Sequence, residues 1–219
     1  MKNKILVVAV HPDDETLGCG GTLLRHKANN DSIHWLICTN MNKKNKYYNT
    51  RQKEITKVSK LYNFDSTNNL QLDTMKVDEY SMSELIEKIS TVINHIKPNI
   101  IYLPFKGDVH SDHRKIFEAA YSCTKSFRYK FIKKVYMIET LSETEFACST
   151  KEDSFIPNTF VDISKHMNKK IDIIKIYKSE LQKHPFPRSI KNIKALATFR
   201  GATSGFKYAE SFVLLKDII

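Results

Sequence analysis

The 219-residue sequence predicts an α/β fold, in which a mostly parallel sheet is flanked by helices. Short apolar runs at residues 5–10, 33–39 and 100–105 alternate with longer segments of helical period. Two of these runs are followed directly by clusters of His and Asp residues, at positions 11–14 and 110–113. Sites in open α/β sheets form at the carboxyl ends of strands, so both clusters fit this fold class and point to a shared functional site.

The length and composition indicate one globular domain spanning residues 1–219. Hydrophobic residues make up 41% and charged residues 27% of the chain, which is ordinary for a domain with a single buried core. Lys2 and Lys4 precede an apolar run, but that run is too short for the hydrophobic region of a signal peptide. No later run approaches the roughly 20 apolar residues that span a bilayer. We therefore expect a soluble, cytoplasmic protein without a membrane span.

The four cysteines support a reducing compartment. Cys19, Cys38, Cys123 and Cys148 lie far apart in the chain and form no Cys-x-x-Cys pair. We expect all four to be reduced thiols in or near the core. Cys19 is nearest the first polar cluster, where a small buried side chain is the favoured role and a redox or ligand role the alternative.

The formal net charge of +11 admits three interpretations. The excess comes from lysines scattered along the chain, without a recognisable DNA- or RNA-binding motif. A solvated surface explains such a distribution best. Electrostatic steering of an anionic substrate is the second interpretation, and nucleic-acid binding is the one we disfavour.

The first half of the chain alternates strands and helices. The expected elements are a strand at 5–10, a helix from Glu15 to about residue 29, a strand at 33–39, a polar loop at 40–50, a helix at 51–61, an edge strand at 70–77, a helix at 83–97 and a strand at 100–105. Gly18, Gly20 and Gly21 lack the spacing G-x-G-x-x-G, which excludes a dinucleotide-binding loop. These glycines would instead let the first helix pack close to the polar turn before it.

The second half continues the alternation. We expect a helix at 114–124, strands at 134–140 and 159–163, a long helix from residue 164 to about 183, and a last strand at 212–215. The segment His-Pro-Phe-Pro-Arg at 184–188 is a stiff aromatic turn, which is either a pocket lip or a simple connector.

The first polar cluster has the residue types of a small metal site. His11 and Asp14 stand three apart across a turn that Pro12 stiffens, and imidazole nitrogen and carboxylate oxygen are usual zinc ligands. Asp13 lies between them, where its carboxylate could take a proton from water at an open coordination position. The alternative is an Asx-turn that caps the helix starting near Glu15.

The second polar cluster would bring two more imidazoles to the same sheet edge. His110 and His113 stand at i and i+3, so they share a face if a helix begins there, and Ser111 or Asp112 can supply the capping oxygen. On its own such a pair would more often lie on the surface. Because this pair follows the strand at 100–105, just as the first cluster follows the strand at 5–10, we expect both clusters at the same edge of the sheet and in a shared site.

Together the two motifs resemble the PIG-L/LmbE family of zinc-dependent N-deacetylases, which act on N-acetylglucosaminyl groups and related amides. The motifs are His11-Pro12-Asp13-Asp14-Glu15 and His110-x-Asp112-His113, and the resemblance spans nearly the whole chain. It implies a Rossmann-like three-layer sandwich. It also implies His11, Asp14 and His113 as zinc ligands, Asp13 as general base, and His110 as the group that stabilises the tetrahedral intermediate or assists the leaving amine.

Two further carboxylates lie close to the imidazoles in sequence. Asp108 precedes His110 by two residues, and Asp112 follows it by two. A carboxylate that accepts a hydrogen bond from a ligand or catalytic imidazole fixes the tautomer of that ring. We expect Asp112 to be this partner of His110, and we place it among the catalytic residues because the family resembles this chain there.

The expected substrate contacts are Arg51, Glu15, Tyr47 and Arg188. Arg51 and Glu54 resemble an Arg-x-x-Glu element of the family, whose arginine would hold a substrate hydroxyl or phosphate; the alternative is an ordinary surface pair. Tyr47 belongs to the polar loop at 40–50, where relatives usually have a glycine-containing segment that this chain lacks.

The C-terminal third matches the family with one departure. Relatives often have Ser-Gln where this chain has Ser179-Glu180, which adds a charge near an expected pocket wall. Arg200-Gly201 and the Ala-Glu-x-Phe element around Glu210 also resemble the family. Glu210 either reaches the site or satisfies a buried backbone group.

The resemblance implies a metal-dependent hydrolase that removes an N-acetyl group from an amino-sugar derivative, such as an N-acetylglucosamine conjugate or a nucleotide-linked sugar. Zn²⁺ is the expected cofactor, although Fe²⁺ could use the same ligands. The expected partner is a small amino-sugar conjugate, and we expect no nucleic acid. Whether the conjugate carries an anionic group and whether the protein forms a homo-oligomer are left open. Hydrolysis of a different N-acyl amide and a non-catalytic metal- or anion-binding module are the alternatives. A structural zinc site usually has four protein ligands and no nearby base, which argues against the module.

Overall fold

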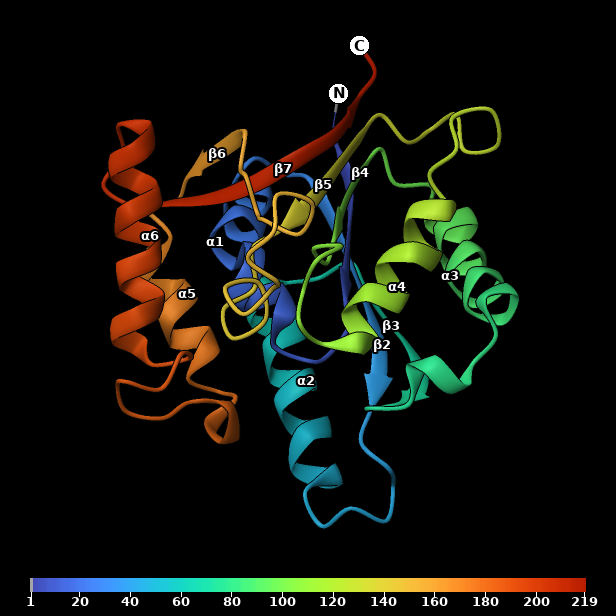
Figure 1. Cartoon of the computed structure of the whole chain (residues 1–219), viewed down its shortest axis with the longest axis horizontal. Coiled ribbons are helices and arrows are strands. Elements are labelled where there is room, and N and C mark those ends of the chain that lie inside the picture. Colours follow the sequence, from blue (N-terminus) through green and yellow to red (C-terminus); the bar gives the residue numbers. More distant parts are fainter. Residues whose placement is uncertain (1) are drawn as a thin grey trace.

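The computed structural model describes residues 2–219 as a seven-stranded sheet with helices on both faces (Figure 1). The strands are β1 (Lys4–Ala9), β2 (Ser32–Asn40), β3 (Ser66–Asp73), β4 (Ile100–Leu103), β5 (Lys134–Ile138), β6 (Thr159–Asp162) and β7 (Ala209–Asp217). They lie in the order β3-β2-β1-β4-β5-β7-β6. Neighbours from β3 to β5 are parallel, whereas β7 runs antiparallel to β5 and β6. The predicted mostly parallel α/β fold is confirmed.

Helices form a layer on each face of the sheet. The α-helices are α1 (Asp14–Ala28), α2 (Tyr48–Tyr62), α3 (Met82–Ile96), α4 (Ser111–Ser122), α5 (Met167–Ile174) and α6 (Ile190–Ser204), and the 3₁₀ helices are η1 (Val77–Glu79) and η2 (Lys178–Glu180). α1, α2, α5 and α6 pack on one face, and α3 and α4 pack on the other (Figure 1). None of the helices within residues 2–219 has both the length and the apolar character that a bilayer crossing requires.

The central strand β1 shows why both faces are covered. Ile5 and Val7 belong to the apolar cluster under α1, whereas Leu6 and Val8 belong to the cluster under α3 and α4. All four side chains are fully buried. Because successive side chains of a strand point to opposite faces, a continuous apolar run requires helices on both sides.

The strand order reverses beside β1, and this places the polar clusters. β1 pairs with β2 on one edge and with β4 on the other, so the chain runs outward in one direction and then returns to the far side of β1. Loops leaving the carboxyl ends of β1 and β4 diverge there and open a crevice. The turn before α1 and the turn before α4 both lie at this crevice.

The predicted edge strand exists but is displaced. β3 spans Ser66–Asp73 rather than residues 70–77, and it forms the edge of the sheet as predicted. The strand ends early because Met75 and Val77 donate their N–H groups to the Asp112 carboxylate instead of to β2.

The predicted long helix from residue 164 to about 183 is wrong. α5 covers only Met167–Ile174, and the chain then turns into η2. Tyr177 has a non-helical backbone (φ −77°, ψ 67°), and its buried ring places the hydroxyl on Glu15. The apolar spacing that suggested one helix is therefore shared between α5 and a buried turn.

Helix α6 is absent from the predicted elements, although its termini carry recognisable signals. The Ser189 hydroxyl accepts a hydrogen bond from Asn192 N–H at the start of the helix. Gly205 ends it with a φ of 79°, a conformation that glycine adopts without strain. The helical period of the segment between them is weak because only three of its residues, Ile193, Ala197 and Gly201, are buried.

Two smaller expectations also need correction. Cys19, Cys38 and Cys123 are buried as expected, but Cys148 is exposed in the irregular segment between β5 and β6. Contrary to the expectation from the sequence, the glycines of α1 do not pack against the polar turn at residues 11–14 that precedes the helix. Cβ atoms at Gly18 and Gly21 would instead lie within 3 Å of Ile138 and Ile163, so these glycines let α1 approach the sheet closely.

Candidate active site

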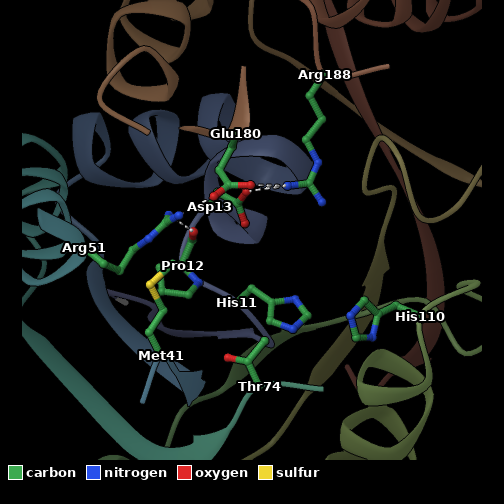
Figure 2. A pocket seen from close by; sticks show the side chains of 9 residues that line it. All are labelled: His11, Pro12, Asp13, Met41, Arg51, Thr74, His110, Glu180 and Arg188. Carbon is green, nitrogen blue, oxygen red and sulfur yellow. Dashed lines mark hydrogen bonds and ion pairs between the residues drawn. The ribbon is translucent and has the colours of Figure 1, made fainter. Parts of the chain in front are cut away.

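Residues from both polar clusters line a pocket at the crevice beside β1. Its cavity volume is about 200 Å³, and the lining residues are His11, Pro12, Asp13, Met41, Arg51, Thr74, His110, Glu180 and Arg188 (Figure 2). Figure 2 shows Glu180 and Arg188 on one side of Asp13, and His11 and His110 on the other. The two motifs predicted to converge are therefore brought together.

His11, Asp14 and His113 form a three-sided cluster behind this pocket. His113 Nε2 lies 3.3 Å from His11 Nδ1 and 3.4 Å from Asp14 Oδ2, and His11 Nδ1 lies 3.9 Å from the same oxygen. Asp14 Oδ1 is buried and has no hydrogen-bond partner within residues 2–219. Two imidazole nitrogens and a carboxylate oxygen, all within 4.8 Å of one another, are suitable ligands for one divalent metal ion.

Asp108 orients the His113 imidazole of this cluster. Asp108 Oδ2 lies 2.8 Å from His113 Nδ1, and the Thr144 hydroxyl donates to Asp108 Oδ1 at 2.7 Å. A proton on Nδ1 leaves the lone pair of His113 on Nε2, where the cluster needs it. Burial alone would lower the pKa of His113, but the Asp14 and Asp108 carboxylates outweigh it and raise the pKa to about 9. The negative charge of these two carboxylates also favours a cation between His11, Asp14 and His113.

The expected contact between the Asp112 carboxylate and His110 is wrong. The Asp112 carboxylate accepts Met75 N–H at 2.8 Å and lies 3.4 Å from His11 Nε2. Asp112 thus orients His11 and holds the segment after β3 against the site. The atom that caps α4 is His110 Nδ1, which accepts Asp112 N–H at 3.1 Å, rather than an oxygen of Ser111 or Asp112.

His110 is held in one neutral form by this cap. Because Nδ1 accepts a hydrogen bond, the ring proton lies on Nε2, which can donate to a ligand in the pocket. Burial and the neighbouring His11 and His113 rings lower the pKa of His110. A second possible metal cluster of His11, His110 and Asp112 is disfavoured, because His110 Nδ1 already accepts a backbone N–H group and Nε2 carries the ring proton.

Asp13 has a strained backbone and a buried carboxylate. Its φ of 138° is rare for a residue with a side chain, and its N–H donates to Glu15 at 3.0 Å. The side chain makes no capping hydrogen bond, which removes the Asx-turn alternative. Oδ2 accepts Arg188 at 2.8 Å, whereas Oδ1 is buried without a partner among residues 2–219. Burial raises the pKa of Asp13 well above its usual range against the lowering effect of Arg188.

Of the expected substrate contacts, Arg51 and Arg188 line the pocket. Glu15 does not reach it: this fully buried carboxylate accepts the hydroxyls of Thr16 and Tyr177 behind the turn, and burial raises its pKa to about 7. Tyr47 is 56% exposed at the start of α2 and is not part of the lining.

Two lining residues, Met41 and Thr74, were not singled out from the sequence. Glu180 lies in the lining, as expected from the sequence, which placed this charge near a pocket wall. Met41 and Thr74 follow β2 and β3, so only the strand order brings them to the same edge as His11. Glu210 does not reach the site, because its carboxylate accepts Gly21 N–H and Thr22 N–H within α1.

Comparison with known proteins agrees with this arrangement. A family described as "PIG-L: GlcNAc-PI de-N-acetylase" matches residues 6–124, a stretch that contains both polar clusters. Diacetylchitobiose deacetylase from Thermococcus kodakarensis is 23% identical over 234 residues, covering 98% of this chain and 84% of that protein.

Solved structures share the fold over the whole chain. A conserved protein from Thermus thermophilus superposes with a TM-score of 0.79 at 25% identity, covering 99% of this chain and 96% of that one. The 4-carboxy-2-hydroxymuconate hydratase of Pseudomonas putida superposes with a TM-score of 0.77 at 15% identity, covering 100% and 98% of the two chains, which is a likeness of fold alone. Because the family match covers more than half of the sequence and includes both clusters of the site, this protein belongs to the PIG-L family.

Proposed function

We propose that this protein is a metal-dependent N-deacetylase that hydrolyses the acetamide of an amino-sugar derivative. The observation that carries the proposal is the buried Asp13 carboxylate, which lines the pocket directly beside the His11, Asp14 and His113 cluster. Membership of the PIG-L family and the similarity to a diacetylchitobiose deacetylase support an N-acetylated amino sugar as the substrate class.

The reaction consumes water and releases acetate and a free amine. A divalent ion held by His11, Asp14 and His113 would supply Lewis acidity to the amide carbonyl and to water. Asp13 accepts the proton that water loses on attacking the carbonyl carbon, while Arg188 holds its carboxylate in place. Asp13 then returns this proton to the leaving nitrogen as the carbon–nitrogen bond breaks.

His110 stabilises the negative charge that develops on the carbonyl oxygen during the reaction. Its Nε2–H donates a hydrogen bond to the carbonyl oxygen as that oxygen becomes an oxyanion. A neutral imidazole suffices because the bond from Asp112 N–H fixes the proton on Nε2. Loss of one such donor typically costs about 3 kcal/mol of transition-state stabilisation.

Zinc is the metal we propose for this site. Two imidazoles and one carboxylate leave a coordination position free, as in catalytic zinc sites. Fe²⁺ accepts the same ligand types, so reconstitution with each metal separately distinguishes them. A cytoplasmic location stays a prediction, to be checked by cell fractionation, and light scattering decides whether the protein is a homo-oligomer.

The fold alone does not decide the reaction, because a hydratase shares it. Hydration of a carbon–carbon double bond, hydrolysis of a different acyl group and simple metal binding therefore serve as competing outcomes. Only deacetylation converts an N-acetyl sugar into acetate and an equal amount of new amine.

The test is acetate release from diacetylchitobiose by chelator-treated protein before and after addition of zinc. We expect about one zinc per chain and acetate release only from the reconstituted protein. His113→Ala should bind no zinc, whereas His95→Ala, at an exposed position of α3, should behave like the wild type. Zinc binding without acetate from any N-acetylglucosamine conjugate would contradict the proposal.

A further inference from the structure

Glu180 lies between the two arginines of the pocket. Its Oε1 pairs with Arg51 Nη2, and its Oε2 lies 3.2 Å from Arg188 Nη1 (Figure 2). The side chain remains 27% exposed and lines the cavity. A substrate therefore meets a carboxylate at this end of the pocket, with one guanidinium on each side of it.

The donors of Arg188 are almost all used by the protein itself. Nη1 donates to Asp13 at 2.8 Å and to Glu180, Nε donates to Ser142 at 2.6 Å, and Nη2 donates to Glu143 at 3.0 Å. A guanidinium has five N–H groups, so one remains. One N–H cannot form the parallel pair of hydrogen bonds by which arginine recognises a phosphate or carboxylate.

Arg51 is occupied in the same way. Nη1 donates to the Pro12 carbonyl at 3.1 Å, Nη2 donates to Ser179 and Glu180, and Nε faces Glu54 at 3.4 Å. The Nε–H and one N–H of Nη1 are left, but every parallel donor pair of a guanidinium includes Nη2, whose two N–H groups are both used. Neither arginine presents a free fork to the cavity, although both line it.

Each arginine at this end of the pocket lies against a carboxyl group of the protein. The positive groups that line it are Arg51 and Arg188, and the negative groups are Asp13 and Glu180. A phosphate or carboxylate entering here would meet both carboxylates at close range and would have to displace Glu180 to reach either guanidinium. Like charges placed together in a binding site are a common means of rejecting a competing ligand.

We propose that Glu180 is a specificity-determining residue, which makes this pocket select an uncharged N-acetylated sugar over one that carries a phosphate or carboxylate. The inference rests on the proposed function. An uncharged sugar offers hydroxyl groups, which can donate to the exposed part of the Glu180 carboxylate. The part of the substrate that lies in this pocket is therefore uncharged.

The kinetic test compares N-acetylglucosamine with its 6-phosphate. Wild-type protein should have the higher kcat/KM for the uncharged sugar. Glu180→Gln keeps the shape of the side chain but removes the charge and weakens its hold on both arginines, so we expect the preference to shift toward the phosphate by about tenfold. An unchanged preference in this variant would overturn the proposal.

A matched control removes a carboxylate from the same arginine outside the pocket. Glu54 pairs with Arg51 but is not part of the lining. Glu54→Gln should leave the preference within about threefold of wild type, because its charge does not face the cavity. An equal shift in both variants would mean that any carboxylate near Arg51, and not Glu180 in particular, determines the preference between the two sugars. That result also overturns the proposal.

A binding measurement separates this inference from the proposed reaction. Glucosamine and glucosamine 6-phosphate lack the acetyl group and cannot react, so calorimetry with the zinc-loaded protein reports recognition alone. Glu180→Gln should gain affinity for the phosphorylated sugar relative to glucosamine even if no N-acetyl sugar is hydrolysed. No gain in a folded variant would overturn the inference, while acetate release by the wild type would still support the proposed function.

Discussion

His113 depends on a carboxylate that motif spacing does not single out. Asp108 fixes its tautomer from the loop before α4, and Thr144 in turn holds Asp108. Partners of this kind typically contribute about 10- to 100-fold to metal affinity. The orientation of His113 is thus shared among three separate segments of the chain.

Asp108→Asn should therefore weaken zinc binding by about 10- to 100-fold. The amide can still accept a hydrogen bond from His113, but it no longer strengthens the basicity of the ring. Competition with a chromophoric chelator measures the affinity, and Asp78→Asn, an exposed carboxylate in η1, serves as the control. Wild-type zinc affinity in folded Asp108→Asn would refute the assigned role.

His26 provides a pH-sensitive contact remote from the metal cluster. Its Nδ1 lies 2.7 Å from Asp31 and its Nε2 lies 3.0 Å from the Tyr102 hydroxyl. Burial lowers the pKa of His26 below its ordinary value of 6.5, although Asp31 opposes this. As pH falls below 6.5, the unfolded chain takes up a proton that the folded chain does not, so stability is lost toward acid.

The free energy of unfolding of the wild type should accordingly fall relative to that of His26→Gln between about pH 7.5 and about pH 5.5. Urea denaturation at a series of pH values measures the difference. The exposed His95→Gln variant should track the wild type throughout. A constant difference between wild type and His26→Gln would show that His26 does not titrate differently on folding.

The sequence predicted that His11, Asp14 and His113 come together because ligand chemistry and motif spacing are local. His11 and Asp14 share one turn, and His113 follows a second strand end. The choice of Asp112 as the carboxylate partner of His110 was wrong, because such a choice depends on which way each carboxylate points. Asp112 faces the segment after β3, and nothing in the local spacing of residues 108–113 reveals that contact.

At the scale of elements, α1 is two helical pieces joined at Cys19, where the backbone is non-helical (φ −144°). The break leaves N–H groups of Gly21 and Thr22 for Glu210, which accepts them at 2.8 and 2.7 Å. Lys170 from α5 pairs with Glu210 at 2.6 Å, and both side chains are about 95% buried. Strand β7 and helix α5 thus hold the break that positions the polar turn before α1.

Glu210→Ala should lower the free energy of unfolding by about 3–5 kcal/mol, because it leaves Lys170 buried without its partner and two backbone donors unsatisfied. Urea denaturation followed by circular dichroism gives the value. Glu79→Ala, which removes an exposed pair with Lys76, should cost less than about 1 kcal/mol. Equal losses in the two variants would contradict this role for Glu210.

Elements with a strong apolar period were predicted well, and those fixed by tertiary contacts were not. α3 has four buried residues at helical spacing and a Ser81 cap, and it lies where the sequence placed it. The segment after α5 has the same apolar spacing, but Tyr177 leaves the helix to reach Glu15. Helix α6 was missed because few of its side chains are buried, although both of its caps could have been recognised.

At the scale of the whole molecule, the reversal of strand order beside β1 creates the site. It joins His11 after β1 to His113 after β4, which lie about a hundred residues apart, and it admits Arg188 from the C-terminal third. The alternation of strands and helices predicts such a crevice. The identity of its far wall, Glu180 and Arg188, depends on a buried turn that sequence periodicity describes incorrectly.

In the proposed reaction, Asp13 moves protons while His11, Asp14 and His113 hold the metal. The most direct measurement is zinc content and acetate release on the same preparation of Asp13→Asn. Asparagine has the same size and shape as aspartate, so the turn, with its φ of 138°, should remain intact. We predict wild-type zinc content and a loss of acetate release of about 100-fold or more. Wild-type acetate release in the zinc-loaded variant, or loss of its zinc, would contradict the division of roles.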